Sequence, residues 1–243
     1  MCGRFAITLP PEAVRAFFAY VEQPNFPPRY NIAPTQPIPL VVARAGAGGR
    51  ERHFLLARWG FLPAFVKDPK AFPLLINARA ETLAGKPSFR AALRRRRCLV
   101  IADGFYEWRR AAPGAPKAAA KAPYLVRRVD RAPFGFAGLM EAWSDPSGGQ
   151  IDTACIVTVT ANRLMARLHD RMPAILESEA FALWLDNDGV DAGVATALLR
   201  PAPEAALELV PIGPAVNRVA NDDAAVQVPI GEPIRAAPPE KAR

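Results

Sequence analysis

Short extended segments, separated by proline and glycine, are the feature that most constrains the fold of this chain. Its 243 residues include 26 prolines and 16 glycines. The clearest segment is DTACIVTVT (152–160), whose side chains alternate between two faces of a strand. Further strands are expected at 3–8, 38–44, 53–61, 73–81, 98–108, 124–130, 134–143 and 207–212. The core is therefore expected to be mainly β-structure.

A few short helices are expected around this sheet. The segment PPEAVRAFFAY (10–20) has prolines at its start, which suits a first helical turn. The segment SFRAALRRRR (88–97) has Ser88 in a position to cap the helix. Two more helices are expected at 178–185 and 194–200. The expected fold class is α+β: a single domain with a mixed, barrel-like β core and flanking helices.

No long polar linker divides the chain, so one domain is expected over residues 2–228. The proline-rich segment 24–39 is expected to be an ordered surface loop. The Ala/Pro/Lys-rich segment 111–123 is expected to be a long hairpin loop. Residues 229–243 are rich in proline, alanine and charge, which predicts a disordered tail.

Cysteine and histidine are too few and too scattered for a disulfide framework or a metal site. Cys2, Cys98 and Cys155 are far apart in the sequence and odd in number, which favours a reducing compartment. His53 and His169 form no cluster with them, so no metal and no cofactor are expected. We interpret His53 as a structural residue.

A net charge of +8 favours a polyanionic partner, with nucleic acid as the first candidate. The alternative is that the positive charge has no partner and only reflects an organism whose proteins are generally basic. No apolar run approaches a membrane span, and no signal peptide is recognisable. We therefore expect a cytoplasmic protein, associated with the nucleoid when it is bound to DNA.

Cys2 is the first candidate for chemistry. Removal of Met1 would leave a free α-amine and a free thiol on adjacent carbons of Cys2. A thiolate there would be favoured by nearby Arg4 or Arg79. The alternative is an incidental residue next to a start codon.

Two other segments carry polar side chains in a pattern that suggests a site. In NARAE (77–81), an extended backbone would place Asn77, Arg79 and Glu81 on one face, which suits a sugar and a phosphate. The alternative is a solvated face on which the arginine pairs with the glutamate.

In ADGFYEW (102–108), Glu107 lies between Tyr106 and Trp108. Burial favours a protonated carboxyl group, so Glu107 is a candidate general acid; the alternative is a residue that only packs. His169 and Arg171 also share one face, and histidine exchanges protons near neutral pH, although a lone histidine is often structural.

Aromatic and basic residues alternate in RWGFLPAF (58–65), where Trp59 and Phe65 lie near Arg58 and Lys67. Bases of single-stranded nucleic acid stack on aromatic rings while cations follow the phosphates. The alternative is that these rings belong to the core.

Taken together, these segments resemble the SRAP (SOS-response-associated peptidase) family. The matching motifs, in the family's order, are MCGRF, YNIAPTQ, ARWGFLP, NARAET, PSFR, RRCLVIADGFYEW, FAGLMEAW and HDRMPAIL. They run from Cys2 to about Val219. The resemblance implies a sensor that crosslinks through its N-terminal cysteine to abasic sites in single-stranded DNA, with possible self-removal of Met1.

The resemblance also implies roles for individual residues. Catalytic roles fall on Cys2, Asn77, Glu107 and His169, and expected DNA contacts are Arg4, Trp59, Phe65, Arg79, Trp108 and Arg171. Phe65 is a departure, because the family often has tryptophan there. The expected partner is single-stranded DNA with abasic sites, with no membrane, no obligate protein partner and a monomeric state.

The chemistry explains a cysteine at position 2. An abasic sugar opens to an aldehyde, the α-amine forms an imine with it, and the neighbouring thiol closes a five-membered thiazolidine ring. The alternative enzyme is an N-terminal-nucleophile glutamine amidotransferase or thiol hydrolase, in which the Cys2 thiol attacks an amide carbon.

Overall fold

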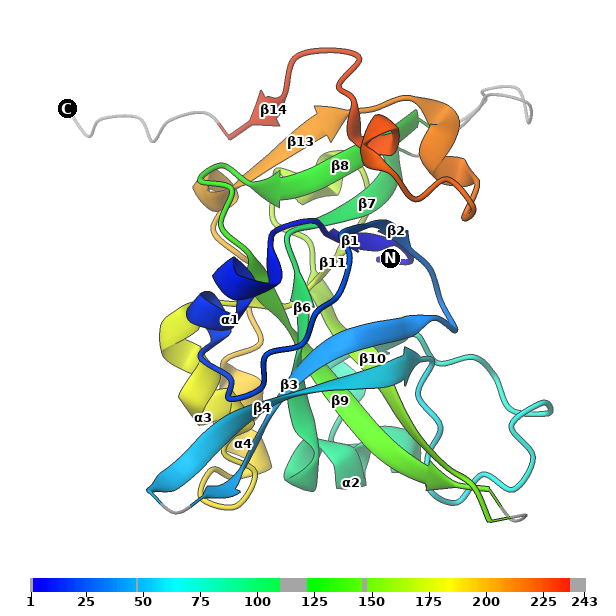
Figure 1. Cartoon of the computed structure of the whole chain (residues 1–243), viewed down its shortest axis with the longest axis vertical. Helices are drawn as coiled ribbons and strands as arrows, with labels where there is room; N and C mark the ends of the chain where they lie inside the picture. The colour runs from blue at the N-terminus through cyan, green and yellow to red at the C-terminus, as the bar shows by residue number, and fades with distance from the viewer. Residues whose placement is uncertain (1, 47, 110–121, 146–147, 237–243) are drawn as a thin grey trace.

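A closed five-stranded barrel lies at the centre of the fold (Figure 1). The computed structural model describes residues 2–46, 48–109, 122–145 and 148–236. The barrel strands are β3 (Pro37–Gly46), β4 (Gly49–Trp59), β6 (Arg97–Ala102), β9 (Phe134–Ser144) and β10 (Gln150–Thr160). They pair in the order β10–β4–β3–β6–β9, and an antiparallel ladder between β9 and β10 closes the ring.

A glycine on β9 allows its neighbours to approach closely. Gly138 is paired with Cys98 on β6 and with Ile156 on β10. A Cβ atom at Gly138 would lie 2.9 Å from Cys98 Sγ and 3.3 Å from the Cys155 carbonyl oxygen. Both cysteines are free thiols and fully buried, so the space that a larger residue would need is already filled.

A second sheet lies above the barrel in Figure 1. Its strands are β1 (Phe5–Ile7), β2 (Arg29–Ile32), β7 (Gly104–Arg109), β8 (Ala122–Arg128), β13 (Leu207–Pro211) and β14 (Ile234–Arg235). They pair in the order β14–β13–β8–β7–β1–β2. Strand β1 is therefore an inner strand, antiparallel to β2 on one side and to β7 on the other.

Asp103 joins the two sheets, because it lies between the last residue of β6 and the first of β7. Its Oδ2 accepts hydrogen bonds from the Thr8 hydroxyl (2.9 Å) and the Leu9 backbone N–H (2.8 Å), just after β1. Burial raises the pKa of the Asp103 carboxyl group, and these bonds oppose that rise. The end of β1 is thereby fixed to the point where the chain leaves the barrel.

Helices and short strands cover the barrel. The helices are α1 (Pro11–Phe18), α2 (Pro87–Arg95), α3 (Phe181–Leu185) and α4 (Ala192–Ala197), and the short strands are β5 (Asn77–Arg79), β11 (Arg171–Pro173) and β12 (Ile175–Leu176). Single 3₁₀ turns occupy Ala80–Thr82, Met165–Arg167, Ser178–Ala180, Glu204–Ala206, Pro214–Asn217 and Ala224–Gln227. Phe18 of α1 stacks on Phe181 of α3 with ring centroids 5.3 Å apart, which holds both helices on the same side.

The predicted fold class is confirmed, while some local predictions are wrong. Ser88 is not the cap of α2: the helix begins at Pro87, and Lys86 at the cap position makes no side-chain cap bond. Part of the expected loop 24–39 is strand β2. Pro24, Pro27 and Pro28 precede β2 and take no part in its ladder.

The chain after Val228 is ordered as far as the structure describes it, contrary to the expected tail. Pro229 forms an isolated bridge with Ile212, and Ile234 of β14 pairs with Leu209 of β13. Residues 237–243, and residues 110–121 of the expected hairpin loop, lie outside the described residues. No described helix has the length and apolar character that a membrane crossing requires.

We predict that Gly138→Ala lowers the free energy of unfolding by about 1–3 kcal/mol, because the added methyl group overpacks the barrel interior. Urea denaturation measures this loss. The matched control is Gly85→Ala, since a Cβ at Gly85 would meet no atom within 4 Å. Equal stability of the two variants would contradict the tight contact at Gly138.

Candidate active site around Cys2

The first residues of the chain extend the upper sheet toward Cys2. Phe5 pairs with Phe105, and the Tyr106 N–H donates to the Arg4 carbonyl oxygen at 2.9 Å. Continuing this antiparallel pairing brings Cys2 to the segment of β7 that contains Glu107. The Cys2 side chain is fully buried, as part of the main hydrophobic core.

The surroundings of the Cys2 thiol disfavour its ionised form. Burial raises the pKa of this thiol well above its ordinary value, and the negative charge of Glu107 raises the pKa further. The expected thiolate stabilisation by Arg4 or Arg79 is therefore wrong. Arg4 donates instead to Asn31 Oδ1 and to the Val216 carbonyl oxygen, both at 2.8 Å.

Asn77 fixes the backbone at Cys2. Strand β5 is parallel to β10, with Asn77 opposite Ile156, and the Asn77 Nδ2 donates to the Cys2 carbonyl oxygen at 2.9 Å. The Asn77 Oδ1 is also buried, and no group among the described residues donates to it. A buried acceptor without a donor is unfavourable, so this oxygen is suited to a bound group beside Cys2.

Glu107 places a buried carboxylate next to the thiol. The residue is 5% exposed, on the same strand as Phe105, whose ring packs in the core. Its Oε1 lies 3.4 Å from the Trp108 backbone N–H, which donates to it. Its charge acts on the Cys2 thiol, so the two groups share one electrostatic environment.

His169 lies in the turn that leads into β11. Its Nδ1 accepts the Arg171 backbone N–H at 3.0 Å and lies 2.7 Å from Asp170 Oδ1. These two contacts cannot both be hydrogen bonds at once, because Nδ1 accepts from Arg171 only when it carries no hydrogen and donates to Asp170 only when it carries one. Both contacts hold the ring at the start of β11.

The predicted common face of Asn77, Arg79 and Glu81 does not form. The chain leaves the strand after Arg79 and enters a 3₁₀ turn at Ala80–Thr82, so the alternation stops. Glu81 pairs with Arg171 instead, through oxygen–nitrogen distances of 2.6 and 3.0 Å. Arg79 lies exposed at the end of β5, opposite Thr158 of β10.

A model of the SOS response associated peptidase (SRAP) family matches residues 1–219 of this chain. The chain belongs to the SRAP family. It is 36% identical over 225 residues to the abasic site processing protein YoqW of Bacillus subtilis, covering 91% of this chain and 96% of YoqW. It is 32% identical over 270 residues to the abasic site processing protein HMCES of Gallus gallus, covering 95% and 78%.

Solved structures have the same fold as this SRAP chain. A protein of Bacteroides thetaiotaomicron superposes with a TM-score of 0.80 at 24% identity, covering 93% of this chain and 98% of the other. A phage-related protein of Bordetella bronchiseptica superposes with a TM-score of 0.68 at 31% identity, covering 87% and 94%.

The SRAP chain exposes only some of the residues predicted to contact DNA. Trp59 is fully buried: its Nε1 donates to the Ile76 carbonyl oxygen at 2.9 Å, and its ring packs edge-on against Phe5. Trp59 therefore belongs to the core, because its indole N–H finds a partner there. Phe65 is 59% exposed, and Trp108 is half-buried beside Asn217.

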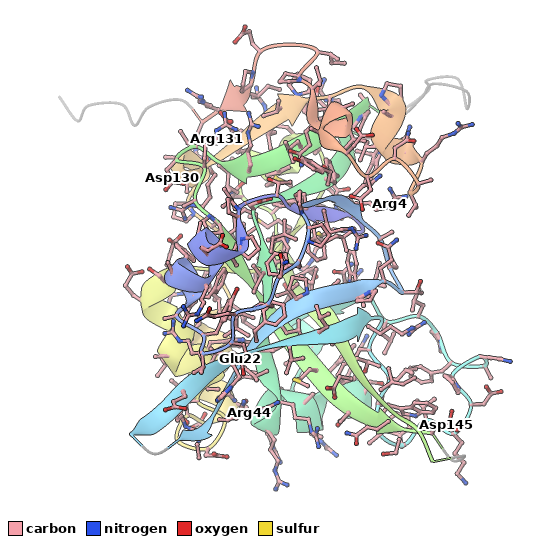
Figure 2. All side chains as sticks on the ribbon, in the orientation of Figure 1. Arg4, Glu22, Arg44, Asp130, Arg131 and Asp145 are labelled. Carbon is pink, nitrogen blue, oxygen red and sulfur yellow. The ribbon has the colours of Figure 1, made fainter. Side chains whose placement is uncertain are left out.

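Two predicted DNA-contact arginines already have protein partners. Arg4 lies beside β1 and β2 in Figure 2, bonded to Asn31. The Arg171 side chain is 13% exposed, and its Nη2 donates to the Thr158 carbonyl oxygen at 2.5 Å in addition to the Glu81 pair. Both arginines therefore fix backbone near the site: Arg4 bonds to the Val216 carbonyl oxygen and Arg171 to the Thr158 carbonyl oxygen.

Asn31 is a positioning residue that residue-by-residue reasoning missed. It is fully buried, and its Nδ2 lies 2.8–3.1 Å from the carbonyl oxygens of Val216, Arg218 and Asn221. Through Arg4 it connects the segment after β13 to the first residues of the chain. The available signal was the asparagine in YNIAPTQ, a polar residue within a motif of the SRAP family.

We predict that Glu81→Gln destabilises the protein in a pH-dependent way. The Arg171 hydrogen bonds hold the pKa of Glu81 below its ordinary value, so this pair stabilises the fold above the unfolded pKa. The contribution is lost as pH falls through the folded pKa. At pH 7 the loss is at most about 1 kcal/mol, because Glu81 is half-exposed and screened by solvent.

Urea denaturation from pH 7 to pH 3 measures this effect. The difference between wild type and Glu81→Gln is expected to disappear at the acid end. The control is Glu232→Gln at an exposed position. A difference that stays constant with pH would show that the pair does not stabilise the fold through charge.

Proposed function

We propose that this chain senses abasic sites in single-stranded DNA and crosslinks to them through Cys2. The observation that carries the proposal is the Asn77–Cys2 hydrogen bond, which holds Cys2 in the electrostatic environment of a buried glutamate. Membership of a family whose relatives include proteins named for abasic site processing supports the choice of substrate. The net charge of +8 favours the polyanion.

The proposed reaction starts at the Cys2 α-amine, which requires hydrolysis of the Met1–Cys2 peptide bond, whether by the protein itself or by another peptidase. The amine adds to the aldehyde of the opened sugar, and loss of one water gives an imine. The thiol then adds to the imine carbon. A C–S bond forms, the C=N bond becomes C–N, and the thiol proton passes to the nitrogen. The product is a thiazolidine ring.

The electrostatics of Cys2 support this order of steps. An α-amine with a pKa near 8 is roughly 10% neutral at pH 7, so it is available as the first nucleophile. The thiol, whose pKa burial raises, brings the proton that the ring nitrogen needs. As the amine adds, Glu107 can accept the proton that the nitrogen loses and pass it to the departing water, and His169 can exchange protons with solvent. Asn77 Oδ1 accepts a hydrogen bond from the amine or the sugar.

The alternative use of Cys2 is as the nucleophile of an N-terminal-nucleophile glutamine amidotransferase or thiol hydrolase. That chemistry depends on a thiolate, or on a base that generates one. Burial and the charge of Glu107 raise the pKa of the Cys2 thiol, which disfavours the thiolate that this alternative needs. This alternative also gives no product with DNA.

We predict that the stable crosslink requires both groups of Cys2. Wild type and three variants are incubated with a single-stranded oligonucleotide that carries one abasic site, and denaturing gels are run after heating. Cys2→Ala stops at an imine that borohydride traps. Cys2→Ser gives no heat-stable adduct, and a residue retained before Cys2 abolishes the adduct although the thiol remains.

Intact mass first verifies that Met1 is absent from the wild type. An oligonucleotide without the abasic site is the control, and only background is expected from it. A heat-stable adduct from the extended protein, equal to that of the wild type, would rule out the thiazolidine. Glutamine hydrolysis without any DNA adduct would replace the proposal by the amidotransferase.

We predict that Glu107→Gln slows crosslinking by about 10- to 10⁴-fold, the range for loss of a general acid, and leaves affinity for intact single strands unchanged. The rate is measured on quenched gels, and the affinity by fluorescence anisotropy. The matched control is Glu141→Gln: Glu141 is also buried, at 7% exposure, but pairs with Arg96. Equal rates in both variants would leave Glu107 with a packing role.

A further inference from the structure

A cluster of three arginines surrounds one buried carboxylate in the upper sheet. Glu208 of β13 is fully buried, and its Oε1 lies 2.9 Å from Arg127 Nε and 3.0 Å from Arg131 Nη2. Its Oε2 accepts bonds from Arg235 Nε (3.0 Å) and Nη2 (2.8 Å). We call Arg127, Arg131, Arg235 and Glu208 the arginine cluster.

Both oxygens of the Glu208 carboxylate are engaged, while the arginines keep donors to spare. Glu208 accepts three hydrogen bonds, one from Arg127 and two from Arg235, and forms an ion pair with Arg131. A guanidinium has about five N–H donors and stays protonated in proteins. Within the part of the chain that the structure describes, Arg127 and Arg131 therefore keep donors beyond those that contact Glu208, and the single Glu208 charge does not neutralise both arginines.

A small cleft lies against these two arginines. It has a volume of about 110 Å³ and is lined by Thr8, Leu9, Asp103, Gly104, Leu125, Arg127, Arg131 and Gln227. Asp103 also carries a charge, but hydrogen bonds from Thr8 and Leu9 already engage its Oδ2. Counted over the arginine cluster and Asp103, three arginines and two carboxylates leave one positive charge in excess, with Arg235 lying outside the cleft lining.

Hydrogen bonds within the turn at 128–132 fix the backbone conformation of Arg131. Arg131 has a φ of 63°, in the left-handed region that non-glycine residues rarely adopt. Its N–H donates to the Arg128 carbonyl oxygen at 3.2 Å, and Asp130 Oδ1 accepts the Ala132 N–H at 3.0 Å. Figure 2 shows Asp130 and Arg131 at this turn, on the other side of the upper sheet from Arg4.

We propose that this cleft is a binding site for a single phosphate group, separate from the site at Cys2. The cleft is small, with a volume of about 110 Å³, so a compact group such as phosphate suits it. The N–H groups of the Arg127 and Arg131 guanidinium groups can donate hydrogen bonds to the phosphate oxygens. The excess of one positive charge matches the single negative charge of a phosphodiester.

The phosphate group has two possible sources: a free phosphate ion, or the backbone of a bound DNA strand. The first experiment measures the thermal stability of the full chain in inorganic phosphate against chloride at equal ionic strength. A ligand that binds only the folded state raises the melting temperature. We expect phosphate to raise it more than chloride does.

Arg131→Gln is expected to weaken phosphate binding by about 10- to 100-fold, because hydrogen bonds to a charged group are lost. The melting temperature without phosphate reports any structural loss separately. The matched control is Arg128→Gln, on the same turn: Arg128 pairs with Asp130 and Glu177 and does not line the cleft. This control is expected to keep the phosphate response.

The second experiment identifies the source with an oligothymidylate that has no abasic site. If the cleft takes a backbone phosphate, Arg131→Gln lowers the salt slope of binding by about 0.7, and inorganic phosphate competes with the oligonucleotide. If the cleft takes a free ion, the oligonucleotide affinity is unchanged while the phosphate response is lost.

Two results would overturn the proposal: a wild type that phosphate stabilises no more than chloride, or an Arg131→Gln variant with the full phosphate response. Crosslinking to an abasic oligonucleotide is assayed in parallel. Because the cleft is separate from Cys2, Arg131→Gln is expected to form the adduct at saturating DNA. Failure at Cys2 and failure at the cleft are therefore distinguishable.

Discussion

Strand β10 is the constraint on which the rest of the structure depends, because four other strands pair with it. Its ladder with β9 closes the barrel, and β4 runs parallel to it on the barrel wall. The same strand aligns β5 and β11, so Asn77 lies opposite Ile156 and Arg171 lies opposite Thr160. The barrel and two walls of the candidate site are thus parts of one hydrogen-bonded ladder.

Buried side chains that hydrogen-bond to backbone carbonyl oxygens fix the segments that the strand ladders do not reach. Asn31 binds three carbonyl oxygens and Arg4, and Arg97 donates from the core to the carbonyl oxygens of Trp184 and Leu93. Each contact joins segments that the sheets leave apart. Breaking such a contact leaves a buried group without a partner, which is more costly than the bond itself is stabilising. The loops of this fold are therefore fixed largely by side chains that bond to backbone.

The sequence predicted those features that depend on local pattern. Alternation predicted β10. The resemblance to the SRAP family named Cys2, Asn77, Glu107 and His169; the structure brings Asn77 and Glu107 to Cys2, and the catalytic roles of all four remain predictions. Burial and long-range partners were not predictable. Trp59 lies in a segment of alternating aromatic and basic residues that suggested base stacking. In the structure it is buried, and its Nε1–H donates to the Ile76 carbonyl oxygen. Arg235 was assigned to a disordered tail on composition, which could not show that its partner would be Glu208, 27 positions away.

The inner position of β1 has a mechanical consequence. A load applied at Cys2 along the axis of β1 would act on a strand that is held by β2 on one side and by β7 on the other. Hydrogen bonds between antiparallel strands run perpendicular to the strand axis, so a load in this direction shears several of them at once instead of opening them singly. The bonds of Asp103 to Thr8 and Leu9 anchor the far end of the same strand. The fold therefore resists a pulling force at Cys2, the residue that would carry the proposed crosslink to DNA.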